Sequence, residues 1–227
     1  KVSSSLIQYK KLYESQFNDV QKAVNETNDL PIYFDDRSTT SAEAIFTSIR
    51  ANSKKYGIKM FIIDYLQILS SIKSVNDQQN FLGEVSRKLK NLAKKLNVNI
   101  TVLSQLSRNN QDPMPTLDRL RASGQIAEAS DTVLLIWRPS LYGKTSYKGS
   151  NAPVDGTAEI IIAKGRNVGT GSFIVGFDPS TTNFYDISTE QRLAWDRDFN
   201  SGKKGKDGTG TDIPEPINIS NQKSIPF

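Results

Sequence analysis

The residue whose type and position most clearly suggest a chemical role is Asp64, which follows the apolar run at residues 60–63. A carboxylate at the carboxyl end of a buried parallel strand lies where open α/β sheets bind their ligands. Such a carboxylate can hold Mg²⁺, and the ion neutralises nucleotide phosphates during phosphoryl transfer. Turns and helix N-termini also use Asp, so the rest of the chain has to decide between the two interpretations.

The composition removes most other kinds of catalytic site. The 227 residues contain no histidine and no cysteine. Ser-His-Asp triads, histidine-bound or cysteine-bound zinc and disulfide bonds are therefore excluded. Phosphoryl transfer remains, because it uses cations and Mg²⁺ instead of an imidazole. The net charge of +5 favours polyanionic partners, although many proteins with such a charge bind no polyanion.

No apolar run reaches the roughly 20 residues of a membrane span, and residues 1–5 lack the apolar segment of a signal peptide. A soluble protein without a membrane partner is expected. The chain begins with Lys1, so an N-terminally incomplete domain is expected as well.

Apolar periodicity predicts an alternation of helices and strands. Helices are expected within residues 6–28, from a capping box at residues 40–43 to about residue 55, and over 77–96 and 125–129. Strands are expected at 32–34, 59–64, 99–105, 132–138, 157–164, 172–177 and 184–186. The strands at 59–64 and 99–105 read as fully buried, and those after residue 157 as antiparallel. The prediction is an α/β fold with a mostly parallel sheet flanked by helices and closed by antiparallel hairpins.

Residues 62–67 read Ile-Ile-Asp-Tyr-Leu-Gln and resemble the Mg²⁺-binding strand of DnaB-like replicative helicases. Segments 30–36, 102–108, 120–124 and 158–171 resemble further motifs of that family, in the same order. The resemblance covers roughly residues 30–186 and implies a RecA-like P-loop NTPase core. It also implies ATP and Mg²⁺ as cofactors, a homo-oligomer that is a hexamer, and unwinding of duplex DNA by movement along single-stranded DNA.

The resemblance assigns roles to individual residues. Asp64 would hold Mg²⁺, Gln105 would sense the γ-phosphate, and Lys164 with Arg166 would reach the nucleotide of a neighbouring subunit. The DNA-binding loop would use Arg108, Arg119, Arg121, Ser123 and Gly124, although Ala122 replaces the Glu of the family pattern. Without the resemblance, Gln105 would be a loop cap and the cations ordinary surface charges.

The chain lacks the Gly-x-x-x-x-Gly-Lys-Ser/Thr loop and the upstream catalytic Glu of the family. Residues 1–197 are therefore expected to be an incomplete motor domain that is inactive alone, and 198–227 a disordered or loosely docked tail. A non-catalytic RecA-like scaffold or DNA-binding module is the alternative, and a recombinase-type relative is disfavoured. The resemblance further implies a primase and a helicase loader as partners, and the bacterial cytoplasm, with a bacterial or phage gene.

Overall fold

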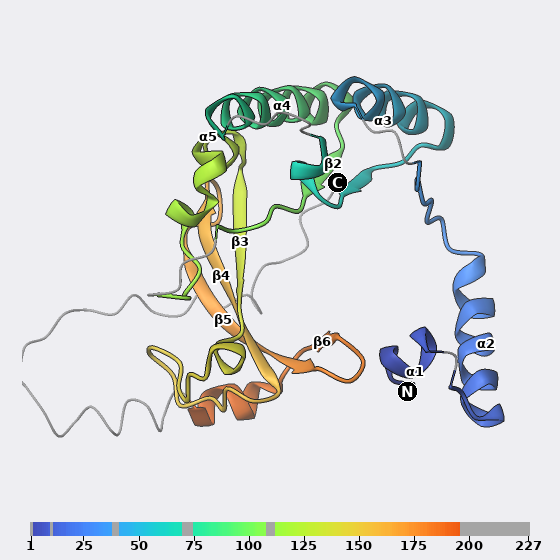
Figure 1. The fold of residues 1–227 in the computed structure, drawn as a ribbon, viewed down its shortest axis with the longest axis vertical. Coiled ribbons are helices and arrows are strands. Elements are labelled where there is room, and N and C mark those ends of the chain that lie inside the picture. Colours follow the sequence, from blue (N-terminus) through green and yellow to red (C-terminus); the bar gives the residue numbers. More distant parts are fainter. Residues whose placement is uncertain (1, 10, 38–40, 70–74, 108–111, 196–227) are drawn as a thin grey trace, which may run out of the picture.

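The computed structural model describes residues 2–9, 11–37, 41–69, 75–107 and 112–195 (Figure 1). The predicted tail at 198–227 lies outside these residues. Among the described residues, no helix combines the length and apolar character needed to cross a membrane.

The α-helices form close to where the apolar periodicity predicts them, whereas the 3₁₀ helices were not predicted. The α-helices are α1 (Ser4–Gln8), α2 (Glu14–Asn28), α3 (Ala42–Tyr56), α4 (Val75–Leu96) and α5 (Gly124–Ala129), with 3₁₀ helices η1 (Leu66–Leu69), η2 (Leu117–Ser123) and η3 (Pro139–Tyr142). Figure 1 shows α1 and α2 set to one side of the other elements. The backbone N–H of Ser4 donates to the Ser180 carbonyl at 3.1 Å, which links α1 to the turn after β5 (Gly171–Asp178).

The start of α3 differs from the prediction by one residue. The Ser41 hydroxyl accepts a hydrogen bond from the Ala44 N–H at 3.1 Å, so Ser41 is the N-cap. The predicted cap by the Thr40 hydroxyl was wrong, and Thr40 itself lies outside the described residues. Gly57 ends the helix with φ +68°, as predicted, because glycine enters the left-handed region without steric penalty.

The strands form two sheets. Strands β1 (Met60–Ile63) and β2 (Asn99–Val102) are a parallel pair with Ile63 opposite Val102. Strands β3 (Thr132–Trp137), β4 (Thr157–Gly165), β5 and β6 (Asn183–Tyr185) form an antiparallel sheet in that order. Parallel and antiparallel pairing are both present, as predicted for the α/β fold. Among the described strands only β1 and β2 pair in parallel, so antiparallel pairing predominates where a mostly parallel sheet was expected.

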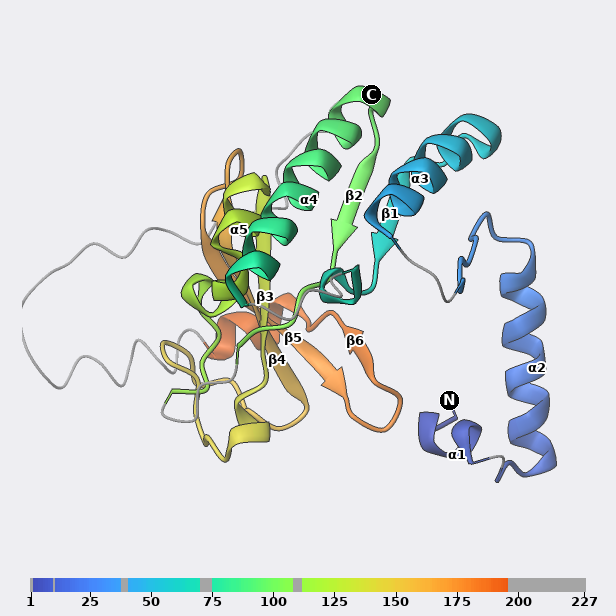
Figure 2. The ribbon, with the colours of Figure 1, turned by 45° about the horizontal axis from the view of Figure 1, so that its top comes forward.

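Helices α3 and α4 cover one face of the β1–β2 pair (Figure 2). The main core lies between them and takes in Phe46, Leu66, Leu82 and Leu89, with Phe61 of β1 packed against it. The opposite face of β1 is open, since Ile62 is 63% exposed. The prediction that β1 and β2 are fully buried was therefore wrong, because the described helices cover only one side of the pair.

The apolar run Ile32, Tyr33 and Phe34 is not a strand, which corrects the prediction for residues 32–34. Phe34 is 91% exposed. A strand needs a neighbour whose N–H and C=O groups are free to pair, and none of the described strands pairs with this run.

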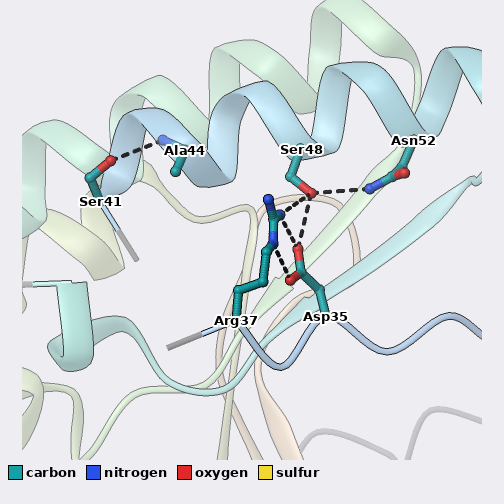
Figure 3. A network of polar contacts seen from close by, with 6 residues as sticks. All are labelled: Asp35, Arg37, Ser41, Ala44, Ser48 and Asn52. Carbon is teal, nitrogen blue, oxygen red and sulfur yellow. Dashed lines mark hydrogen bonds and ion pairs between the residues drawn. The ribbon is translucent and has the colours of Figure 1, made fainter. Parts of the chain in front are cut away.

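The acidic turn that follows this run is bound to α3 (Figure 3). The Arg37 guanidinium donates to both Asp35 carboxylate oxygens at 2.7 and 2.5 Å, and the Ser48 hydroxyl donates at 3.2 Å. The Asn52 amide in turn donates to Ser48 at 3.0 Å. These hydrogen bonds, led by that of Arg37, lower the pKa of Asp35 to about 2.

Candidate functional site

The carboxyl ends of β1 and β2 lie side by side at one edge of the parallel pair. The ladder continues past the strands, since the Leu103 N–H donates to Ile63 at 2.9 Å and the Leu66 N–H donates to Leu103 at 3.0 Å. Asp64 directly follows β1, and Gln105 follows β2 by three residues. The parallel register therefore brings Asp64 and Gln105 to the same sheet edge, as the sequence predicted.

The Asp64 carboxylate is a group at this edge that could hold a divalent cation. Asp64 is exposed, and no other described residue pairs with its carboxylate in a hydrogen bond or an ion pair. The described residues contain no cluster of three or more acidic or other ligating side chains. A lone carboxylate suits Mg²⁺, which in nucleotide sites keeps several waters and takes other oxygens from phosphates.

Gln67 occupies this same edge, and the sequence reasoning gave it no role. Its amide nitrogen donates to the Ser104 hydroxyl at 2.8 Å and lies 3.5 Å from the Gln105 carbonyl. Its amide oxygen accepts from the Gln105 N–H at 3.3 Å. The sequence signal for Gln67 is its place three residues after Asp64, within the Ile-Ile-Asp-Tyr-Leu-Gln run.

Lys164 and Arg166 contact α5 of their own chain. The Lys164 ammonium donates to the carbonyls of Ala127 at 2.6 Å and Glu128 at 3.0 Å. The Arg166 guanidinium donates to Glu128 at 3.0 Å from one residue beyond the end of β4. Both cations therefore satisfy free carbonyls at the C-terminus of a helix, where positive charge is favourable.

Asp131 joins these cations to α4. It forms an ion pair with Lys90 and lies 3.7 Å from the Arg166 guanidinium. The hydrogen bond from Lys90 and the nearby charges of Arg166 and Lys164 lower the pKa of the Asp131 carboxyl. A cavity of about 290 Å³ adjoins this cluster and is lined in part by Arg87, Lys90 and Arg166.

Arg119 spans the base of the predicted DNA-binding loop. Its guanidinium donates to Ser107 at 2.8 and 3.0 Å, to Pro113 at 2.5 Å and to Met114 at 3.0 Å, all at backbone carbonyls. This arrangement fixes residues 107 and 113–114 relative to η2.

The other predicted DNA-binding residues are described only in part. Gly124 begins α5, and the backbones of Arg121 and Ser123 belong to η2, while their side chains lie outside the described structure, as does all of Arg108.

Comparison with known proteins relates the chain to a known family. Residues 1–186 match the family described as DnaB-like helicase C terminal domain. The chain is 39% identical over 164 residues to the replicative DNA helicase DnaB of Leifsonia xyli, covering 71% of this chain and 35% of that protein. It is 30% identical over 200 residues to the DnaB of Rickettsia prowazekii, covering 82% and 41%.

Two solved structures share the fold. One is described as an ATPase domain, with a TM-score of 0.71 and 28% identity over 82% of this chain and 66% of that one. The other, a DnaB-like replicative helicase studied with primase, has the same TM-score and identity. The match covers 82% of this chain and 46% of that one. The chain spans less than half the length of the curated relatives named above. With its RecA-like α/β fold, the chain belongs to the DnaB-like helicase C-terminal domain family.

Proposed function

We propose that this chain belongs to the motor domain of an ATP-dependent replicative DNA helicase. The protein would hydrolyse ATP with Mg²⁺ and separate duplex DNA while it moves along single-stranded DNA. The observation that carries the proposal is the shared sheet edge of Asp64 and Gln105, produced by the parallel pairing of β1 and β2.

Asp64 and Gln105 would serve the nucleotide. The exposed carboxylate of Asp64 is suited to hold Mg²⁺, which when bound neutralises phosphate charge. The exposed Gln105 amide can donate to a phosphate oxygen and orient a water with its carbonyl. Both groups act by positioning and charge, which is what phosphoryl transfer requires of a protein.

Lys164 and Arg166 would act on the nucleotide of the neighbouring subunit in a homo-oligomer, which we take to be a hexamer. A cation at the transferred phosphoryl group stabilises the charge that develops there. The Arg166 side chain is 51% exposed, so turning it toward a neighbour breaks only surface contacts, with the Glu128 carbonyl on α5 and with the Asp131 carboxylate.

Single-stranded DNA would lie along the segment that carries Arg108, Arg119, Arg121, Ser123 and Gly124. Cations and backbone N–H groups contact phosphates without reading sequence. A primase would be a partner, which is supported by the structural relative described with its interactions with primase. A helicase loader and a site of action in the bacterial cytoplasm, whether the gene is bacterial or from a phage, complete the proposal.

The test uses the full-length protein and measures DNA-stimulated ATP hydrolysis. We expect Asp64→Asn to abolish activity and Arg166→Ala to reduce kcat by on the order of 10³-fold or more. Arg50→Ala, which removes an exposed arginine on α3, is the matched control and should retain activity. Mixing Asp64→Asn with Arg166→Ala subunits should restore part of the rate, because each supplies what the other lacks.

Two results would count against the proposal. A wild-type protein without DNA-stimulated ATPase activity would overturn the function as a whole. Wild-type activity in Arg166→Ala would overturn the role of that arginine alone.

A further inference from the structure

The Gln67 side chain bridges two segments that are almost 40 residues apart in sequence. Its amide faces the backbone of Gln105 with one donor and one acceptor, at 3.5 and 3.3 Å, and also donates to the Ser104 hydroxyl at 2.8 Å. A strand residue presents the same pair of groups to its neighbour. The side chain of Gln67 thus takes the place of a backbone partner beyond the end of β2.

The backbone of Gln67 is fixed by the residues on both sides. Leu66 is completely buried and Leu69 is 8% exposed, and both pack in the core with α3 and α4. The Leu66 N–H also donates to Leu103 at 3.0 Å. Gln67 therefore stands on a rigid base, which allows its side chain to define where Gln105 lies.

Neither strand pairing nor burial holds Gln105 in place, because β2 ends at Val102 and Gln105 itself is exposed. A side-chain partner can supply that restraint. The backbone ladder from β1 reaches Leu103, whose carbonyl accepts from Leu66. Among the described residues, the contact to the backbone N–H of Gln105 comes from the Gln67 side chain.

We propose that Gln67 is a positioning residue that fixes the backbone of Gln105 relative to Asp64. The consequence for catalysis rests on the proposed function, in which Gln105 reads the nucleotide and Asp64 holds the ion. A Gln105 amide held in one place meets its target in one geometry, and small displacements of a catalytic group reduce the rate strongly. Loss of Gln67 should therefore lower kcat and leave nucleotide binding nearly unchanged.

The structural half of the proposal is tested by amide hydrogen exchange on this whole chain. Gln67→Met keeps the length of the side chain and removes its hydrogen bonds. We expect exchange at the Gln105 N–H to become roughly threefold to tenfold faster, as loss of one hydrogen bond implies. Exchange at the Leu103 N–H should stay the same, since it is bonded to Ile63. Gln8→Met, at an exposed glutamine on α1, is the matched control.

The catalytic half is tested in the full-length protein by a double-mutant cycle. We expect Gln67→Met to reduce kcat by about tenfold with KM within about twofold, the pattern of a lost transition-state interaction. In a Gln105→Ala background the same substitution should have no further effect, because both changes remove one function. Ser104→Ala removes the hydroxyl that accepts a hydrogen bond from Gln67, and it should also lower kcat, by a smaller factor.

The proposal is overturned if exchange at Gln105 is the same in Gln67→Met and Gln8→Met. It is also overturned if Gln67→Met lowers the ATPase rate by an equal factor with and without Gln105. Absence of ATPase activity in the wild-type protein would instead reject the proposed function, and the exchange rates would still decide the structural role of Gln67.

Discussion

Arg166 and Asp131 are joined by two separate contacts. The backbone N–H of Arg166 donates to the Asp131 carbonyl at 2.9 Å, and its guanidinium lies 3.7 Å from the Asp131 carboxylate. Asp131 also pairs with Lys90 on α4. The Asp131 carboxylate therefore links the turn that carries Arg166 to α4, and it can be removed without disturbing the core.

We expect Asp131→Asn to lower the free energy of unfolding at pH 7 modestly. Each exposed pair contributes about 0.2–1 kcal/mol, and the Asp131 side chain is 51% exposed. Because the pKa of folded Asp131 is lowered, its contribution is present above the unfolded pKa of about 3.9 and lost as pH falls through the folded pKa. Urea denaturation of both proteins should show a gap at pH 7 that shrinks as the pH falls below the unfolded pKa. A gap whose size does not change with pH would contradict the role of the charge.

Much of the fold could be predicted from the sequence because its signals are local. The apolar residues Leu82, Val85, Leu89 and Leu92 recur at helical spacing, and all four are buried on α4. Residues 32–34 show the limit of this reasoning. Their apolar character suggests a strand, but a strand forms only where a neighbouring strand can pair with its backbone. Whether one is available depends on the arrangement of the whole chain.

The candidate site divides in the same way. The adjacency of Asp64 and Gln105 follows from parallel pairing, which alternating strands and helices already imply. The contact of Lys164 with Ala127 joins residues 37 positions apart. The hydrogen bonds of the Gln67 side chain with Ser104 and Gln105 join residues 37 and 38 positions apart. Such contacts are set by side-chain approach in space, and a sequence pattern carries no record of them.

Asp35 should titrate well below an ordinary aspartate. We expect a pKa of about 2 in a carboxyl NMR titration, because Arg37 and Ser48 donate to the charged form. Arg37→Ala should return most of the pKa toward its usual value, and Ser48→Ala a smaller part. The stabilisation is present above the unfolded pKa of about 3.9 and is lost as pH falls toward 2. An unchanged pKa in Arg37→Ala would show that the network in Figure 3 does not hold the carboxylate in solution.

Two helical glycines should respond to alanine in opposite directions. At Gly83 on α4, a Cβ atom would lie 2.6 Å from the Cβ of Gln125, so the α4–α5 contact has to open. We expect Gly83→Ala to destabilise by about 1–3 kcal/mol despite its better helix propensity. Gly124 has helical backbone angles and nothing within 4 Å of an added Cβ, so Gly124→Ala should stabilise by about 0.4–1 kcal/mol. Thermal unfolding of the two variants measures the difference, and equal shifts would contradict the close approach.

At Arg119, the effect of the positive charge can be tested separately from the effect of the guanidinium shape. Its planar guanidinium reaches the carbonyls of Ser107, Pro113 and Met114 together, which the compact ammonium of lysine cannot do. We expect Arg119→Lys to speed proteolysis between residues 107 and 119 nearly as much as Arg119→Gln does. Protection of the lysine variant at the wild-type level would mean that positive charge alone is required, as expected for a residue that only contacts phosphates.

The two apolar residues of η1 that flank Gln67 should differ sharply in their contribution to stability. Leu66 is fully buried in the core, whereas Ile68 is 55% exposed. We expect Leu66→Ala to lower the free energy of unfolding by about 2–5 kcal/mol, since it removes buried contacts and leaves a cavity. Ile68→Ala, in the same 3₁₀ helix, should change it by no more than about 0.5 kcal/mol. Urea denaturation of both variants gives the comparison. Similar losses would mean that Ile68 is also covered in solution, and that the base supporting Gln67 is larger than the buried cluster around Leu66.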